Sequence, residues 1–225
     1  MGFNESTHAF LIARYYARLT DAFGRRGEAA FVHAVDYYAG QRGRRMAQRA
    51  IRDGQPLTHA TFVRYGELQM TDEVEPIVSE VVSLSPDYEV RISACPWHRQ
   101  FEQMGCLQAG RVYCRHIDKA LWSGFAPEVR FEAPSNLNEA QCCVQRVVGA
   151  DHHTLPEAEP TGRYRRDFGY HCGHAYWSFR EVVGAIFGAA GERVASGVLE
   201  DFAASYGEQM ADALAAWKNT NFNVC

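Results

Sequence analysis

The stretch YEVRISACPW, residues 88–97, alternates apolar and polar side chains and then reaches a proline. Alternation with a period of two predicts a β-strand with one buried face, because successive side chains of a strand point to opposite sides. Pro96 ends the strand, since proline has no N–H to donate to a neighbouring strand. Cys95 therefore lies just past a strand end, where loops carry reactive groups on a rigid support. The alternative is a small packed residue, because free cysteine is among the most buried residue types.

Two further strands are predicted later in the chain. Residues 128–132 and 141–148 have strand-like patterns, and residues 134–139 between them contain a proline and two asparagines. Turn residues between two short strands predict an antiparallel hairpin. Upstream, Pro76 suits the first position of a short helix over residues 76–84, although the β-branched side chains there leave a strand as the alternative.

Two helices are predicted in the N-terminal quarter. The first begins at a cap on Thr7 and ends at Gly24, and the second covers residues 28–52. The second half of this second helix is basic, through Arg42, Arg44, Arg45, Arg49 and Arg52. We expect this run to be a solvated helix face, with a surface for an anionic ligand or partner as the alternative.

The last sixty or so residues are also expected to be helical. Apolar side chains recur there about one turn apart, at Val194, Val198, Phe202, Tyr206, Met210 and Leu214. Such a stripe is typical of a helix that faces a core. Residues 151–162, with two prolines and two histidines, predict a loop. Together the patterns predict an α+β fold, with a small central antiparallel sheet flanked by N-terminal and C-terminal helices in a single domain, residues 1–225.

Composition and charge exclude several classes of protein. Of 225 residues, 47% are hydrophobic and 22% are charged, which is typical of a soluble globular protein and not of a disordered chain. A net charge of −4 argues against nucleic acid as a partner, and the absence of an apolar run of about 18 residues argues against a membrane span. The N-terminus has no signal-peptide pattern. We expect a cytoplasmic protein whose partner is a small-molecule substrate, and a homo-oligomer remains open.

The chain has seven cysteines and no CxxC pair. An odd number without a signal peptide argues against a disulfide framework, and the missing pair removes the usual zinc-ribbon and thioredoxin-type signals. The cysteines are therefore expected to be reduced, as core residues, metal ligands or nucleophiles.

One constellation is Cys114 with Asp118, which share a face of the helix predicted over residues 112–123. They can be a nucleophile with its proton shuttle or two metal ligands, and the alternative is a thiol facing the core and a carboxylate facing water. An ionised carboxylate raises the pKa of a nearby thiol, so a cation would have to activate it. His116 is a local candidate, but it points away by roughly half a turn.

The neighbours Cys142 and Cys143 lie on a predicted strand, where their side chains point to opposite faces. At most one of them can share a pocket with Cys95 and Cys114.

A last motif places His171 and His174 three residues apart. On a helix they share a face and can bind one metal, but the spacing is not a recognised zinc motif. Aromatic residues surround the motif, so packed histidines are the preferred interpretation.

A family resemblance rests on three motifs: the strand ending in Cys95-Pro96-Trp97, then Tyr113-Cys114 with Ile117-Asp118, and the hairpin cysteine near Cys143. These resemble the L-2-amino-thiazoline-4-carboxylic acid hydrolase family, and the helix around residues 42–47 and the terminal helices are similar as well. The resemblance implies a hydrolase that opens a thiazoline ring by adding water and yields a carbamoyl-cysteine. The doubled cysteine leaves the matching residue ambiguous, with Cys143 fitting better than Cys142.

The residues expected to be catalytic are Cys95, Cys114, Asp118 and Cys143. A cysteine can attack the ring carbon while a nearby acid or base shuttles protons. Alternatively, Asp118 can activate water while the cysteines hold a metal that polarises the substrate. The thiol mechanism is slightly preferred, because no standard metal spacing is present. No cofactor is predicted, and a divalent metal remains open.

Substrate binding is expected to involve Trp97, Arg91, Arg99, His116, His171 and His174. One of the two arginines would bind a substrate carboxylate. Two other function classes stay open: a sensor that holds a small ligand without turnover, and a structural metal protein whose thiols only stabilise the domain.

Overall fold

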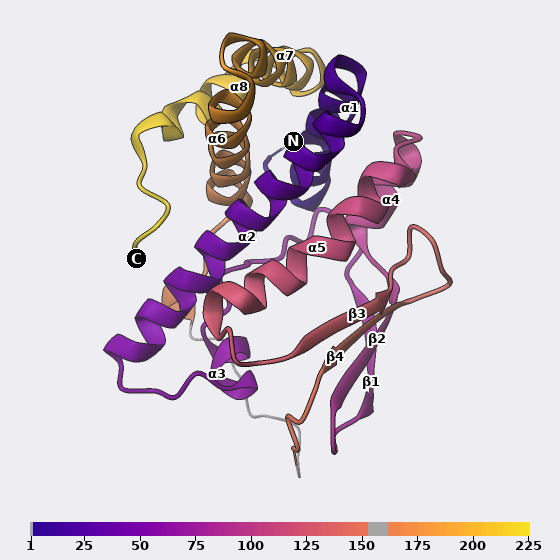
Figure 1. The fold of residues 1–225 in the computed structure, drawn as a ribbon, viewed down its shortest axis with the longest axis vertical. Helices are drawn as coiled ribbons and strands as arrows, with labels where there is room; N and C mark the ends of the chain where they lie inside the picture. The colour runs from indigo at the N-terminus through magenta and orange to yellow at the C-terminus, as the bar shows by residue number, and fades with distance from the viewer. Residues whose placement is uncertain (1, 153–161) are drawn as a thin grey trace.

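The computed structural model describes residues 2–152 and 162–225. Residues 153–161, most of the loop predicted over residues 151–162, lie outside this range. Helices form one side of the molecule and a four-stranded antiparallel sheet forms the other (Figure 1). The predicted α+β class is confirmed.

Two long helices begin the chain, α1 (Glu5–Phe23) and α2 (Arg25–Arg52). Asn4, rather than Thr7, is the N-cap of α1, because its side chain accepts the Thr7 N–H at 3.0 Å and the Thr7 hydroxyl accepts the Asn4 N–H at 2.9 Å. This reciprocal pair is a capping box. The first helix ends at Gly24, as predicted, where φ is 56° and a residue without a side chain is favoured.

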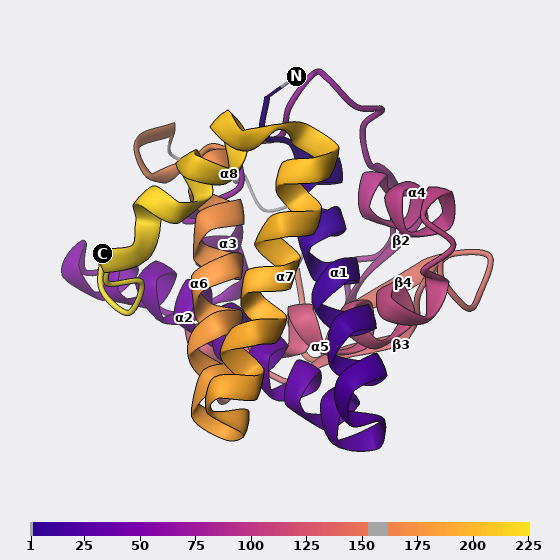
Figure 2. The same cartoon turned by 90° about the horizontal axis from the view of Figure 1, so that it is seen from above.

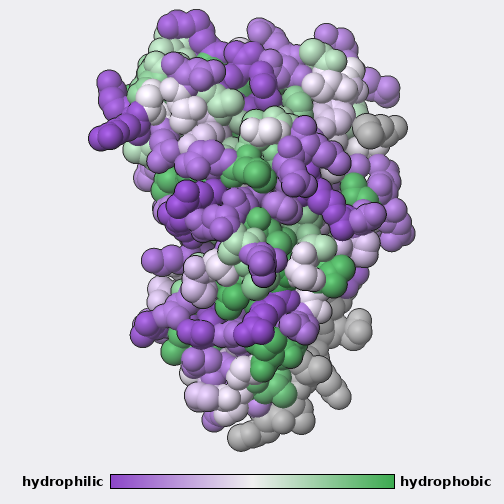
Figure 3. Space-filling model, turned by 90° about the vertical axis from the view of Figure 1, so that its right-hand side faces the viewer, coloured by the Kyte–Doolittle hydropathy of each residue, from purple (hydrophilic) through white to green (hydrophobic). Residues whose placement is uncertain are grey.

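The sheet has the order β1-β2-β4-β3. Its strands are β1 (Val78–Ser83), β2 (Tyr88–Ala94), β3 (Phe131–Ser135) and β4 (Cys143–Val147). The strand predicted from residues 88–94 has these bounds, and β3 and β4 form the predicted antiparallel pair. On the outward side, Arg146 of β4 pairs with Glu89 and Glu132. This edge of the molecule presents a mainly hydrophilic surface with separate apolar patches (Figure 3).

The prediction of a helix over residues 76–84 is wrong. This segment is β1, an edge strand that pairs antiparallel with β2 through contacts such as Val81 with Val90. Pro76 precedes the strand, where it leaves no ladder hydrogen bond unmade. The β-branched side chains favour an extended chain once a partner strand is available.

A short helix, α3 (His59–Arg64), precedes β1, and two helices, α4 (Pro96–Gln103) and α5 (Leu107–Phe125), lie between β2 and β3. Helix α4 was not predicted, and Pro96, read as a strand end, is also its first residue. Helix α5 crosses α2 at very short range, since a Cβ on Gly43 would lie 2.1 Å from the Leu121 carbonyl oxygen. The glycine therefore fixes how closely α2 approaches α5.

The C-terminal part is helical, as predicted. It contains η1 (Gly162–Tyr164), α6 (Phe168–Phe187), α7 (Ala189–Tyr206), α8 (Glu208–Ala215) and η2 (Ala216–Asn219). The apolar stripe is divided between α7 and α8 at Gly207, whose φ is 91°. Seen from above, α6, α7 and α1 lie next to one another, with α4 and the sheet beyond α1 (Figure 2).

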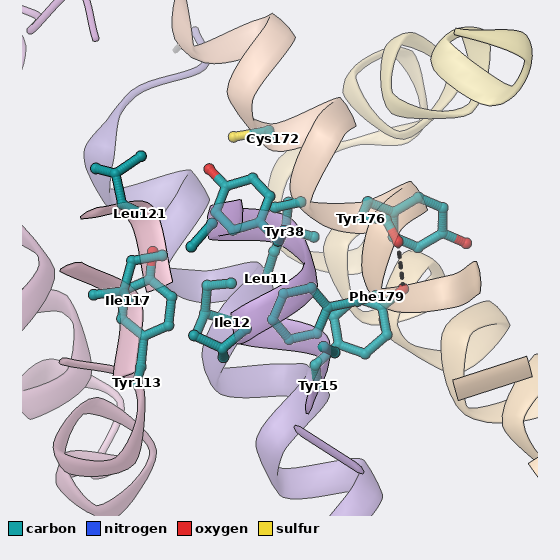
Figure 4. Packing of buried hydrophobic residues seen from close by; sticks show 14 of the residues in the cluster. Leu11, Ile12, Tyr15, Tyr38, Tyr113, Ile117, Leu121, Cys172, Tyr176 and Phe179 are labelled. Atoms are coloured by element: carbon teal, nitrogen blue, oxygen red, sulfur yellow. Dashed lines mark hydrogen bonds between the residues drawn. The ribbon is translucent and has the colours of Figure 1, made fainter. Parts of the chain in front are cut away.

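The core lies where α1, α2, α5 and α6 meet. Leu11, Ile12 and Tyr15 of α1 pack there with Tyr38 of α2 and Phe179 of α6 (Figure 4). The Tyr15 hydroxyl donates a hydrogen bond to the Tyr176 carbonyl oxygen at 2.9 Å, which satisfies a buried polar group. In residues 2–152 and 162–225, we find no helix with the length and apolar character that a membrane crossing requires.

The solvated face expected for the basic run on α2 is wrong for three of its five arginines, whereas Arg44 and Arg52 are exposed. Arg42, Arg45 and Arg49 are buried, and Arg45 is fully covered. Glu67 provides the counter-charge, with oxygens 2.7 Å from Arg45 Nη2 and from Arg49 Nη1. Buried charges of this kind require a partner, which sequence spacing alone does not reveal.

Candidate active site

A small pocket of about 170 Å³ lies between the sheet and helices α2 and α5. Its walls come from α2, α4, α5 and strands β2, β3 and β4, together with residues before β1. The lining residues are Arg42, Leu68, Ile77, Ile92, Cys95, Trp97, Tyr113, Cys114, Ile117, Asp118, Ala133, Ser135, Asn136, Cys143 and Gln145. The structure thus brings together all four residues expected to be catalytic.

The register of β2 and β4 sets the sheet side of the pocket. Ile92 lies opposite Cys143, and Val90 lies opposite Gln145, so these side chains share the inward face. The Leu137 N–H donates to Cys143 Sγ at 3.2 Å. Cys142 does not line the pocket, as expected because adjacent side chains on a strand point to opposite faces.

Helix α5 supplies the opposite wall. Cys114 and Asp118 lie four residues apart on α5, and both line the pocket. Their neighbours Tyr113 and Ile117, on the same helix, are labelled in Figure 4. Asn138 Nδ2 donates to Cys114 Sγ at 3.4 Å. The helix spacing predicted this shared face.

Cys95 lies at the N-terminal end of α4, in the N-cap position. Burial raises the pKa of the Cys95 thiol, and the Asp118 charge adds to this rise, while the nearby backbone N–H groups of His98 and Trp97 favour the thiolate by a smaller amount. The N-terminal end of a helix also favours negative charge, because the helix dipole is positive there.

Trp97 also lines the pocket, and a hydrogen bond to His8 of α1 holds its indole ring in place. Its indole Nε1 donates to His8 Nδ1 at 3.1 Å, so the hydrogen on the His8 ring belongs to Nε2, which lies 3.0 Å from the Tyr38 hydroxyl. Burial holds the pKa of His8 well below its ordinary value. The neutral ring therefore fixes the indole orientation.

Burial governs the charges in the pocket. It raises the pKa of Cys143 to about 11 and the pKa of Cys114 well above its ordinary value. Burial also raises the pKa of Asp118 to about 6, while the Arg42 charge and a hydrogen bond from Gln145 Nε2 at 2.8 Å to Asp118 Oδ2 oppose this rise. Near neutral pH the thiols are protonated, and Asp118 titrates within reach of physiological pH.

Three residues expected to bind substrate lie away from the pocket. Arg91 is exposed on β2, on the face turned away from Ile92. Arg99 pairs with Glu75 outside the pocket. His116 lies on another side of α5, with Nδ1 3.7 Å from Asp36 Oδ1.

His171 and His174 are fully buried behind the pocket. His171 Nε2 lies 3.2 Å from the Glu67 carbonyl oxygen, and His174 Nε2 lies 2.8 Å from Gln41 Oε1. Burial lowers the pKa of both rings well below the ordinary value, so both are neutral. The two histidines pack around the buried arginines and are not exposed as metal ligands, which agrees with the preferred prediction of packed histidines.

All seven cysteines are free thiols. Within the part of the chain that the structure describes, no three histidine, cysteine, aspartate or glutamate side chains gather into a metal-binding group.

The sequence analysis did not place Arg42 or Gln145 in the site, and it gave an anionic-ligand surface for the run that contains Arg42 only as the alternative. The signal for Arg42 was its spacing, since it lies four residues from Tyr38 and four from Met46 on the apolar face of α2. Gln145 follows Cys143 by two residues on a strand, and this spacing puts both side chains on one face.

Comparison with known proteins places the chain. No curated protein and no solved structure matches it. The sequence model of one family, described as L-2-amino-thiazoline-4-carboxylic acid hydrolase, matches residues 4–147, more than half of the chain. The matched range contains every residue of the pocket, and the family's name suggests hydrolase activity on a thiazoline. This match, which agrees with the motifs in β2, α5 and the hairpin, shows that the chain belongs to the L-2-amino-thiazoline-4-carboxylic acid hydrolase family.

Proposed function

We propose that the pocket is the active site of a hydrolase that opens a small heterocyclic ring, a cyclic amidine or lactam such as 2-amino-thiazoline-4-carboxylate, by adding water. The observation that carries this proposal is Asp118, a buried carboxyl with a pKa of about 6 that shares the pocket with Cys95, Cys114 and Cys143. A carboxyl that titrates near neutral pH can take a proton in one step and return it in the next. The pocket size supports a small substrate, since a cavity of about 150 Å³ holds a benzene molecule.

Cys95 is the proposed nucleophile. Its place at the N-terminal end of α4 and the N–H groups of Trp97 and His98 favour the thiolate that forms as it attacks. Cys114 and Cys143 lack a helix N-terminus and have strongly raised pKa values, which keep them as neutral thiols.

The proposed reaction has two stages. Cys95 Sγ attacks the ring carbon between sulfur and nitrogen while Asp118 takes the thiol proton, and the ring C–S bond breaks as the leaving sulfur receives a proton. Water then attacks the same carbon, Asp118 takes a proton from it, and the bond to Cys95 breaks as the thiol is restored. The net change is the addition of one water to the substrate.

The test is mass spectrometry of 2-amino-thiazoline-4-carboxylate and a panel of related cyclic amidines and lactams incubated with the purified protein. We expect a product heavier by one water. Asp118→Asn should lower kcat by more than about 100-fold, because general acid–base catalysis contributes roughly that much or more, and Cys95→Ser should remove turnover.

The chain offers a matched control in its doubled cysteine. Cys143→Ser changes the pocket, whereas Cys142→Ser makes the same substitution one residue away and outside it, so only the first should alter turnover. Full activity in both Cys95→Ser and Asp118→Asn would refute the assignment. Stabilisation of the protein by ring compounds without any product would instead favour a ligand-binding sensor.

A further inference from the structure

The guanidinium of Arg42 is a buried cation with unused hydrogen-bond donors. Its side chain is 7% exposed and lines the pocket. Among residues 2–152 and 162–225, its buried Nε has no hydrogen-bond acceptor, and the nearest carboxylate oxygen, Glu67 Oε2, is 4.0 Å from that atom. Arginine stays protonated at all physiological pH values and has five N–H donors. Buried groups of this kind are almost always paired, so the unpaired state points to a missing partner.

Glu67 supplies negative charge near Arg42 but accepts no hydrogen bond from it, because the Glu67 oxygens already accept hydrogen bonds from other arginines. Arg45 donates to both of its oxygens, at 3.0 and 2.7 Å, and Arg49 donates to Oε1 at 2.7 Å. Asp118, the other nearby carboxylate, accepts its hydrogen bond from Gln145. Arg42, Arg45 and Arg49 thus form a positively charged cluster in which Glu67 directly pairs with Arg45 and Arg49, and Arg42 is the member that lines the pocket.

The position of Arg42 is also fixed. The guanidinium lies over the Tyr38 ring at 5.7 Å, and the backbone of α2 is held against α5 at the adjacent Gly43. A rigid, desolvated guanidinium loses little freedom when it binds an oxyanion, and its flat fork matches the two oxygens of a carboxylate.

We propose that Arg42 binds the carboxylate of the substrate and makes the pocket selective for small rings that carry one. This inference rests on the proposed function for the location of the reaction, but it concerns recognition and not turnover. A volume of about 170 Å³ admits one small ring with a carboxylate and excludes larger anions such as nucleotides. Arg42 thereby takes the role that the sequence suggested for Arg91 or Arg99, which lie outside the pocket.

The test measures equilibrium binding by calorimetry with two aromatic rings that have no hydrolysable amidine: 2-aminothiazole-4-carboxylate and 2-aminothiazole-4-carboxamide. The two differ in charge and not in ring shape. We expect the wild-type protein to bind the carboxylate at least tenfold more tightly than the carboxamide. Arg42→Gln should remove that preference, and Arg42→Lys should retain part of it, because lysine keeps the charge but not the fork.

The controls are Arg91→Gln and Arg99→Gln, which remove one positive charge each outside the pocket and should keep the full preference. Equal binding of the two rings by the wild type, or binding of neither, overturns the proposal, as does an undiminished preference in Arg42→Gln. The wild-type comparison holds even if an Arg42 variant fails to fold. If ring opening is never observed but the carboxylate preference disappears with Arg42, the recognition site stands and the hydrolase proposal fails.

Discussion

Asp118 has its pKa set by opposing neighbours, and this has a consequence for the pH dependence of the proposed reaction. If Asp118 must be ionised to accept a proton, kcat/KM should fall about tenfold per pH unit below about pH 6. Gln145→Leu removes the hydrogen bond that stabilises the carboxylate, so the pKa of Asp118 and the acid limb of the profile should move to higher pH. A pH–rate profile of both proteins checks this, and an unmoved limb in the variant would exclude Asp118 as the titrating base.

The same raised pKa predicts that Asp118 destabilises the folded protein. A carboxyl whose pKa rises from 3.8 to about 6 on folding binds its proton more tightly in the native state, so its ionisation at pH 7 opposes folding. Asp118→Asn should therefore raise the free energy of unfolding at pH 7, by about 3 kcal/mol, while it removes activity. Urea denaturation from pH 4 to pH 7 tests this. The gain should shrink toward pH 4, where the native carboxyl is protonated and the unfolded one is close to its own pKa of 3.8, and a variant less stable than wild type at pH 7 would contradict it.

At the level of single residues, the sequence predicted the thiols and the carboxylate but not the cation. Cys114 and Asp118 share a face because of helix geometry, which a sequence displays directly. Arg42 lies in a run of arginines, and its burial depends on Glu67, 25 positions away and in a segment without regular structure. The spacing of residues on one helix cannot predict burial of an arginine when the counter-charge comes from another segment of the chain.

Among the elements, the error over residues 76–84 has a similar origin. A short β-branched segment behind a proline is ambiguous by its local pattern, and β2 decides its structure by pairing with it. The strand at residues 88–94 was predicted with its bounds because alternation and a terminal proline are both local signals.

The crossing of α2 and α5 supports a prediction about elements. Gly43→Ala would place a Cβ 2.1 Å from the Leu121 carbonyl oxygen and 2.7 Å from the Phe125 nitrogen, both backbone atoms that cannot move aside. The helices must separate, which should cost about 3 kcal/mol of stability and also move Arg42 away from Asp118. Chemical denaturation and turnover of the variant provide the measurement.

The matched control lies one turn away on the same helix. A Cβ on Gly40 would meet the flexible end of the Arg44 side chain, at 3.2 Å. Gly40→Ala should therefore be neutral or raise stability by up to about 1 kcal/mol through helix propensity. If both alanine variants lose the same stability, the close approach of α2 to α5 is not what the glycine provides.

On the scale of the whole molecule, the buried charge cluster connects distant parts of the chain. Glu67 follows α3, its arginine partners lie on α2, and Arg45 Nη1 also donates to the Phe222 carbonyl oxygen near the C-terminus. The Glu67 backbone carbonyl in turn lies 3.2 Å from His171 Nε2 of α6. Because Arg42 is the end of this cluster that faces the pocket, the electrostatics of the proposed site depend on contacts made across the fold.

Glu67→Gln tests that dependence. Although burial alone would raise it, the pKa of Glu67 is lowered, because the hydrogen bonds from Arg45 and the positive charges of Arg45, Arg42 and Arg49 favour the carboxylate. Glutamine keeps the shape but leaves buried arginines without a counter-charge, so the variant should lose about 3–5 kcal/mol. The equivalent change at the half-exposed Glu132 should cost less than about 1 kcal/mol.

The pH dependence separates a charge effect from a loss of packing. A carboxylate with a lowered pKa stabilises the fold above its unfolded pKa, and that contribution disappears as pH falls through the folded pKa. The gap in unfolding free energy between wild type and Glu67→Gln should therefore narrow as pH is lowered from 7 toward 3. A gap that stays constant with pH would mean that Glu67 acts through its shape and hydrogen bonds, and the charge of Arg42 would then need no counter-ion from this cluster.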